Sequence, residues 1–313
     1  MTKPFSFGVN VRSAASAREW AEKARRIEDL GYATLTVPDH LAEMLAPALA
    51  ALSAANATTH LRVGTNVLNN DLRHPVLVAR EAATADLLTG GRFQLGLGAG
   101  HMKAEYEAAG LTFERGARRV ERLTEAVTIV KALLRGERLT FSGRYYRVTD
   151  HAIHPMPVQQ PHPPILIGGN GPRLLELAAR EADIVGLTGI TFADGGTRPD
   201  LTGCRGASVD ERVALIRTAG GKRFEQVVLQ ALVQRVVITK PAFDDRRAAA
   251  ADFARSQLTP EDALESPFTL IGSVEQIADL IQARRARWGI SSYTIFEPAI
   301  EPLAPVVARL TGR

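Results

Sequence analysis

The sequence predicts an α/β protein of the (β/α)8 TIM-barrel class with insertion segments. Eight strand-like segments recur along the 313 residues, and most of them precede a segment in which apolar residues have helical spacing. Strands that alternate with helices form parallel sheets, and eight such units in one chain favour a closed barrel over an open doubly wound sheet. Glycines and polar residues follow several of the strands, where a barrel of this class carries its active site.

The first half of the chain contains four strand–helix units. Short runs rich in β-branched and aromatic residues predict strands over residues 5–11, 33–40, 61–68 and 92–98. Apolar residues at helical spacing, such as Trp20, Ala24 and Ile27, predict helices over residues 16–30, 46–58, 75–91 and 115–134. Gly31 is placed to end the first helix and Pro75 to begin the third.

The second half repeats the alternation. Strands are predicted over residues 165–169, 183–189, 227–239 and 292–297, and helices over residues 172–182 and 274–289. Ser273 and Gln276 have the spacing of a capping box, so the last of these helices is expected to begin there. Further helix is expected near the barrel rim over residues 244–266.

We expect a single domain over residues 1–313 with two departures from the regular alternation. The first is an insertion at about residues 135–163. It contains a predicted hairpin that turns at Ser142 and Gly143, and a Pro-rich extended linker follows it. The second is a stretch rich in Gly, Thr and Asp at about residues 190–209, expected to form a long mobile loop.

Composition narrows the class of protein. A chain with 45% hydrophobic and 23% charged residues is an ordinary globular protein. Its net charge of +4 comes from Arg residues interspersed with Glu and Asp, so a nucleic-acid partner is not expected. No apolar run approaches the roughly 18 residues of a membrane span, and the N-terminus lacks the apolar region of a secretory signal, so we expect a cytoplasmic protein. The single Cys204 excludes an internal disulfide.

The segment RFQLGLGAGH, residues 92–101, has glycines at alternate positions. It does not match the dinucleotide fingerprint G-x-G-x-x-G, because His101 or Lys103 stands where the third glycine is required. In a barrel the same segment lines the mouth of the pocket. Gly98 and Gly100 would there let a flat ligand approach the backbone closely.

Asp39 and His40 follow the second strand. Adjacent residues at a strand end point to different sides, so one side chain can anchor a ligand while the other serves as acid or base near neutral pH. An Asp that caps a helix beside a loop His would explain the pair without chemistry. The spacing of the other histidines does not suggest a metal site.

The fifth strand ends in a glycine-rich turn that opens a helix. Such a turn can bind a phosphate, because its N–H groups are free and the helix dipole attracts an anion. A plain tight turn is the alternative. The residues of this turn are Gly168, Gly169, Asn170 and Gly171.

Blocks along almost the entire chain resemble the bacterial luciferase-like family of flavin and deazaflavin oxidoreductases. The long block over residues 62–100 carries most of the resemblance. Other blocks occur in the same order as in that family, among them VPDH, EYEAAGL, FSGRYYRV, HPMPVQQPHPPILIGGNGP and GSVEQIADLI.

The resemblance implies a flavin-like ring held across the C-terminal mouth of the barrel. It places a bulge with a cis peptide behind the ring at Asn66–Val67. Within the family this chain is most similar to the branch that uses the deazaflavin coenzyme F-420. That similarity implies that Asp39 contacts the ring system, that His40 lies near the hydride-transfer face, and that the turn 168–171 receives the cofactor phosphate.

One departure from this branch concerns His101. Some members carry a Glu acid at this position, which argues against a sugar-phosphate dehydrogenase activity that depends on that Glu. His101 either donates a proton itself or only shapes the substrate pocket.

The resemblance implies hydride transfer between F-420 and a small organic substrate, with His40 and His101 as the catalytic candidates. An FMN-dependent monooxygenase of the same fold, served by a separate flavin reductase, is the first alternative. A non-catalytic flavin-binding protein is the second. The family also implies a homodimer, and the identity of the substrate stays open.

Overall fold

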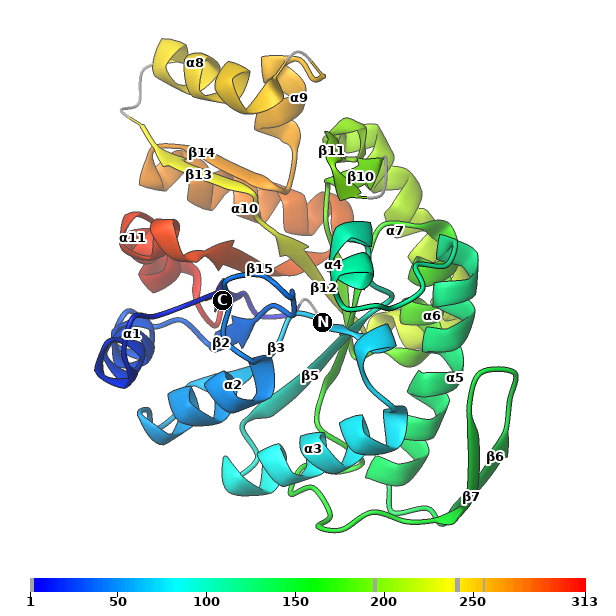
Figure 1. Ribbon diagram of the computed structural model, residues 1–313. Helices are drawn as coiled ribbons and strands as arrows, with labels where there is room; N and C mark the ends of the chain where they lie inside the picture. Colours follow the sequence, from blue (N-terminus) through cyan, green and yellow to red (C-terminus); the bar gives the residue numbers. More distant parts are fainter. Residues whose placement is uncertain (1–2, 194–195, 240–242, 256) are drawn as a thin grey trace.

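Eight parallel strands close into a barrel in the computed structural model, which describes residues 3–193, 196–239, 243–255 and 257–313. The last strand pairs with the first. The fourth strand pairs with residues 63–64 before the Asn66–Val67 bond and with residues 68–69 after it. Figure 1 shows the strands at the centre and the helices around them. The predicted barrel is therefore confirmed. In chain order the barrel strands are β1 (Ser6–Asn10), β2 (Thr34–Val37), β3 (Arg62–Thr65), β5 (Phe93–Gly98), β8 (Ile165–Gly169), β9 (Ile184–Leu187), β12 (Val228–Leu232) and β15 (Ile290–Phe296).

A helix follows each barrel strand and packs an apolar face on the sheet. Ser16 caps the first helix by accepting from the backbone N–H of Glu19, and the predicted capping box of Ser273 and Gln276 is present at α10. The last helix, which closes the chain, was not predicted. These helices are α1 (Ala17–Asp29), α2 (Pro47–Asn56), α3 (Pro75–Leu88), α5 (Gly116–Leu134), α6 (Pro172–Glu181), α7 (Gly206–Gly220), α10 (Val274–Trp288) and α11 (Ile300–Leu310).

The prediction of one strand over residues 227–239 was wrong. The chain leaves the barrel after β12, and β13 (Arg235–Ile238) pairs instead with β14 (Thr269–Gly272) outside it. The change occurs where the backbone N–H of Gln234 donates to Phe268 O at 2.7 Å. Two helices, α8 (Phe243–Ala254) and α9 (Pro260–Glu265), join β13 to β14 and confirm the further helix expected there.

The predicted hairpin is present in the insertion. Its strands, β6 (Leu139–Ser142) and β7 (Arg147–His151), pair antiparallel. The Glu125 carboxylate of α5 fastens the turn by accepting from the backbone N–H groups of residues 144, 145 and 146. Glu125 thus anchors the turn of the hairpin to α5, and Asp86 of α3 holds the linker after it by accepting from the backbone N–H of Gln159 at 2.8 Å.

Residues 190–209 contain more secondary structure than predicted. A small antiparallel hairpin forms from β10 (Thr191–Ala193) and β11 (Arg198–Asp200). A 3-10 turn, η3 (Thr202–Cys204), follows, and α7 begins at Gly206. The mobility of this stretch stays a prediction.

The described residues also limit the kinds of site and environment that the fold provides. None of the helices there combines the length and the apolar character that crossing a membrane requires. In the same residues, His, Cys, Asp and Glu side chains form no group of three or more that could hold a metal ion.

Candidate active site

The predicted site residues lie at the C-terminal ends of β2, β3, β5 and β8 or directly after them, and these ends share one mouth of the barrel because the strands are parallel. Three short elements that leave these ends complete the site. They are β4 (Leu68–Asn69), η1 (Asn70–Leu72) and α4 (Lys103–Ala108).

Asp39 is a buried anchor of the mouth. Its side chain is only 4% exposed and forms an ion pair with Arg73, whose Nη2 donates to Oδ1 at 3.2 Å. Its Oδ2 also accepts from the backbone N–H of Asn69 at 2.9 Å. These bonds connect the end of β2 to the segment after β3. The carboxylate thus has protein partners, and a contact with a ring system stays a proposal.

Asn66 and Val67 form the predicted bulge. The register of pairing with β5 shifts by one residue across them, and the bond between them is cis. Val67 fills the space beside two glycines. A Cβ added to Gly98 would lie 2.5 Å from Cγ2 of Val67, and one added to Gly168 would lie 3.3 Å from Cγ1.

Gly100 leaves room for protein side chains. Its φ of +75° is in the region that favours glycine. A Cβ there would collide with the hydroxyl of Tyr106 and would lie 2.6 Å from Oδ1 of Asn69. On their Cβ sides, Gly98 and Gly100 therefore face Val67, Tyr106 and Asn69 instead of open space for a ligand. Ligand contact with their backbone stays a prediction.

Tyr106 connects α4 to the segment after β3. Its hydroxyl lies 3.0 Å from Oδ1 of Asn69 and 3.1 Å from Oδ2 of Asp71. Asp71 in turn pairs with Arg122 of α5 at 2.9 Å. Burial, followed by the charge of Asp71, raises the pKa of Tyr106, so the phenol stays protonated and donates.

His40 is held by a carboxylate that the sequence did not point to. Its Nδ1 lies 2.9 Å from Oε1 of Glu105 on α4, and the two side chains are 24% and 10% exposed. An ionised carboxylate can only accept, so Nδ1 carries the proton and donates. The Nε2 atom of His40 is then the nitrogen available to take or hold a proton.

His101 packs against His40 at the mouth. The two rings meet edge to face with centroids 5.3 Å apart, and the ring of Phe192 on β10 stacks on His101 with centroids also 5.3 Å apart. Burial, then the charges of His40 and Arg119, lowers the pKa of His101 to about 4. Solvent at the exposed face of His101 screens part of this effect, and the lowered pKa favours the neutral ring at pH 7.

Of the predicted glycine-rich turn, Gly168 and Gly169 form the end of β8, and Asn170 and Gly171 lead into α6. Gly171 is the N-cap of α6 and has no side chain, so no cap side chain accepts from the N–H groups of the first helical turn. Arg212 of α7 holds the turn from behind: its Nη1 donates to Oδ1 of Asn170 at 2.7 Å, and also to Thr188 O. The amide of Asn170 donates to Ile190 O at 3.1 Å.

The structure brings the predicted residues together as two linked groups. Asp39, His40 and His101 surround the ends of β2 and β5, and the glycine turn lies at the end of β8. Val67 joins the two groups, because it lies beside Gly98 at the end of β5 and beside Gly168 at the end of β8. Sequence reasoning missed the side chains that hold these groups, namely Arg73, Glu105, Tyr106 and Arg212. Their signal is weak, because each lies on a helix or turn where a charged or aromatic residue is common.

The model of the luciferase-like monooxygenase family matches residues 2–292. This chain belongs to that family. Among curated relatives, the F420-dependent glucose-6-phosphate dehydrogenase of Microbacterium testaceum is 36% identical over 192 residues, 58% of this chain and 56% of that one. The F420-dependent hydroxymycolic acid dehydrogenase of Mycobacterium tuberculosis is 33% identical over 168 residues, 51% of this chain and 46% of that one. The matches thus span about half the length of these relatives.

The fold also matches solved structures of the family's architecture. The coenzyme F420 dependent tetrahydromethanopterin reductase of Methanopyrus kandleri superposes with a TM-score of 0.76, at 17% identity, over 98% of both chains. At this identity the match shows that the fold is shared.

Proposed function

We propose that this chain is an oxidoreductase that transfers a hydride between the deazaflavin coenzyme F-420 and a small organic substrate. The observation that carries the proposal is the His40–Glu105 pair, which sets an oriented imidazole at the mouth of the barrel. The names of the two curated relatives, both F420-dependent dehydrogenases, support the choice of cofactor.

The residues at the mouth fit such a cofactor. Val67, packed between Gly98 and Gly168, supplies an apolar support for a flat ring. The uncapped start of α6 after Gly171 offers N–H groups and the positive end of a helix dipole to a phosphate. We therefore assign ring contact to Asn66, Val67 and the backbone around Gly98 and Gly100, and phosphate binding to the turn 168–171.

His40 moves the proton in the proposed reaction. Bound F-420 supplies or accepts the hydride. When a substrate hydroxyl or amine is oxidised, Nε2 of His40 takes its proton, and Glu105 stabilises the imidazolium that forms. In the reverse direction the same ring returns the proton. His101 packs on His40 and bounds the space beside it, and its lowered pKa favours the neutral ring.

A titration with each cofactor tests the proposal. The full chain should bind F-420 at least about tenfold more tightly than FMN by isothermal titration calorimetry, a difference of about 1.4 kcal/mol. A deazariboflavin without the phosphate should bind more weakly than F-420, because the turn 168–171 would have no anion to hold.

Tighter binding of FMN would favour the second candidate, a monooxygenase served by a flavin reductase, which the family's own description supports. Cofactor binding without turnover on a broad substrate panel would indicate a non-catalytic protein.

We further propose that the chain forms a homodimer through α2 and α3. The outer faces of these neighbouring helices carry Leu49, Leu77, Leu87 and Leu88, which are 71%, 43%, 46% and 63% exposed. Exposed leucines on adjacent helices are typical of an interface. Sedimentation velocity should show a dimer that the variant Leu88→Glu converts to monomer. Leu111→Glu, at a leucine outside these helices, is the control and should leave the dimer intact.

A further inference from the structure

One side of the barrel mouth lies opposite the proposed cofactor site. Val67, which is proposed to support the ring, lies between the ends of β5 and β8. In the closed barrel the strands β12, β15 and β1 end across the mouth from these two strands. The ends of β12, β15 and β1 therefore border the space that is left for a substrate.

A contact across the barrel shows which side chains of these strands face inward. Nδ2 of Asn66 donates to Oε1 of Gln230 at 3.5 Å, although β3 and β12 are not neighbours in the sheet. Gln230 therefore points into the barrel, and so does its partner Ser292 on β15. Because side chains alternate along a strand, Phe296 at an even spacing along β15 faces the same way, as does its own partner Asn10.

Two buried amides form the floor of this side of the mouth. Asn10 is 3% exposed and Gln230 is 6% exposed. Oδ1 of Asn10 accepts from the hydroxyl of Thr36 at 2.5 Å, and Oε1 of Gln230 accepts from Asn66. Within the part of the chain that the structure describes, neither amide nitrogen has a protein acceptor, and neither is sealed from solvent. Both nitrogens are thus donors open to a ligand.

Arg12 adds a cation above this floor. It follows β1 at the next inward position after Asn10, and its guanidinium carbon lies 5.1 Å from the centroid of the Phe296 ring. Glu297, the acid that follows this ring, is used by Lys23 at 2.6 Å. Arg12 is exposed, and no carboxylate among the described residues pairs with it. The aromatic ring therefore positions the cation without neutralising its charge.

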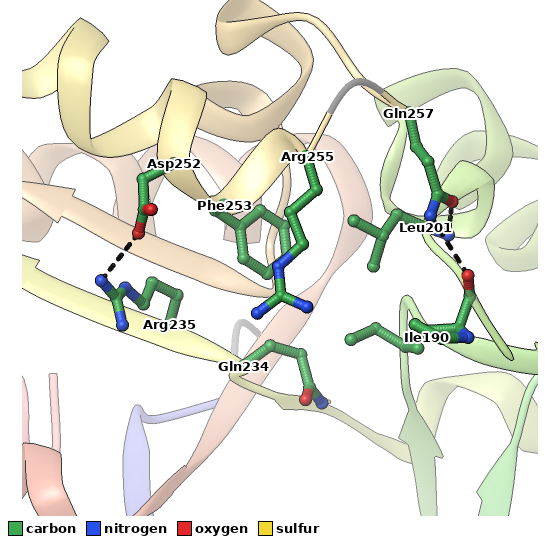
Figure 2. A pocket seen from close by; sticks show the side chains of 9 residues that line it. Ile190, Leu201, Gln234, Arg235, Asp252, Phe253, Arg255 and Gln257 are labelled. Atoms are coloured by element: carbon green, nitrogen blue, oxygen red, sulfur yellow. Dashed lines mark hydrogen bonds and ion pairs between the residues drawn. The ribbon is translucent and has the colours of Figure 1, made fainter. Parts of the chain in front are cut away.

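The cavity on the β9 and β12 side of the mouth differs in this respect. It has a volume of about 200 Å³ and lies between the β10–β11 hairpin and α8 (Figure 2). Figure 2 shows Arg235 of its lining paired with Asp252, at 3.0 Å. The amide of Gln257 is used at both ends, by Leu201 N and by Pro199 O. These polar groups hold the hairpin and α8 together, whereas the donors over β1 and β12 do not serve the fold.

We propose that Arg12, Asn10 and Gln230 form a substrate subsite that binds the carboxylate or phosphate of an organic anion. The assignment rests on the proposed function. Amide and guanidinium donors together select a ligand rich in acceptor oxygens, and a guanidinium binds either anion through charge-assisted hydrogen bonds. His40 follows β2, the strand next to β1, so the group to be oxidised would lie toward His40 and the anionic group toward Arg12.

Chemical protection of Arg12 tests the subsite in the full chain without cofactor. Phenylglyoxal modifies accessible arginines, and mass spectrometry gives the rate of modification at each one. The probes are 3-hydroxybutyrate, glycerol 3-phosphate and the uncharged butane-1,3-diol. At saturation we expect each anion to slow the modification of Arg12 about tenfold or more, and the diol to leave it unchanged. The anion that protects at the lower concentration identifies the preferred head group.

Arg217 is the matched control within the same sample. Like Arg12 it is exposed and lies over an aromatic ring, 5.0 Å from the centroid of Phe224. It belongs to the last turn of α7, which leads into the start of β12 at the end of the barrel away from the mouth. Its modification should not respond to any probe. Equal protection of the two arginines, or equal protection of Arg12 by the diol, would overturn the proposal.

Variants assayed with F-420 connect the subsite to turnover. Arg12→Gln should lower kcat/KM for hydroxy acids about tenfold or more and leave that of the corresponding uncharged diols unchanged, and Arg12→Lys should retain part of the activity. Both variants should fold, because the carbonyl of Arg12, which accepts from Leu45 N at 3.0 Å, is kept. Arg217→Gln should change neither substrate class. Equal loss for acids and diols in Arg12→Gln would contradict the assignment.

The two measurements separate this inference from the proposed function. Protection needs no cofactor, so failure of F-420 to bind would remove the oxidoreductase assignment while a protected Arg12 would still mark an anion site. If F-420 binds and turns over but neither anion protects Arg12, the proposed function stands and the subsite is wrong.

Discussion

Replacement of His40 by Ala is expected to lower the rate of F-420 turnover roughly 10²–10⁴-fold, the usual contribution of a positioned acid or base. The Kd for F-420 should stay essentially unchanged, because neither Val67, which supports the ring, nor the phosphate turn 168–171 involves this imidazole. Stopped-flow measurement of the hydride-transfer step, with calorimetry for cofactor binding, gives both quantities.

A variant of Glu105 separates its role from that of His40. Glu105→Gln keeps the size of the side chain and removes its charge, so the imidazolium of His40 loses its stabilising partner. The rate of hydride transfer should fall while the Kd for F-420 stays unchanged, because Glu105 no longer orients the His40 ring or stabilises the imidazolium that forms when it takes a proton. Glu107→Gln, on the exposed side of α4 beside Lys103, is the control and should leave the rate unchanged. Full turnover in His40→Ala would remove this residue from the mechanism.

Gly100→Ala is expected to destabilise the protein by about 2–4 kcal/mol. A residue with a side chain pays about 1 kcal/mol or more at positive φ, and overpacking adds about 1–3 kcal/mol. The added Cβ would press on Tyr106 and Asn69. Their displacement disturbs the segment that also anchors Asp39, so F-420 binding should weaken as well. Chemical denaturation gives the free energy of unfolding, and cofactor titration gives the Kd.

Gly110→Ala is a matched control for this variant. Gly110 has nearly the same φ, +70°, and a Cβ there would meet nothing within 4 Å. It should therefore cost only the conformational part, about 1 kcal/mol. Equal destabilisation by the two variants would show that the packing of Tyr106 against Gly100 contributes nothing.

Prediction from sequence was most successful for features that are local in the chain. Trp20, Ala24 and Ile27 repeat at helical spacing, and each is buried in α1 as expected. Ser273 and Gln276 form their capping box across only three residues. The run 227–239 shows the limit of this approach: it reads as one continuous apolar strand, yet pairing with β15 ends where pairing with β14 begins.

By itself, the sequence determined the alternation of strands and helices and the set of residues at the strand ends, including Asp39, His40 and the turn 168–171. Periodicity and turn chemistry act within a few residues, so both can be inferred without coordinates. The tertiary structure alone decided which side chains hold that set: Arg73 for Asp39, Glu105 for His40 and Arg212 for Asn170. These contacts join segments 34, 65 and 42 residues apart. No spacing rule encodes such a contact, because it depends on how the closed barrel brings separate loops to one mouth.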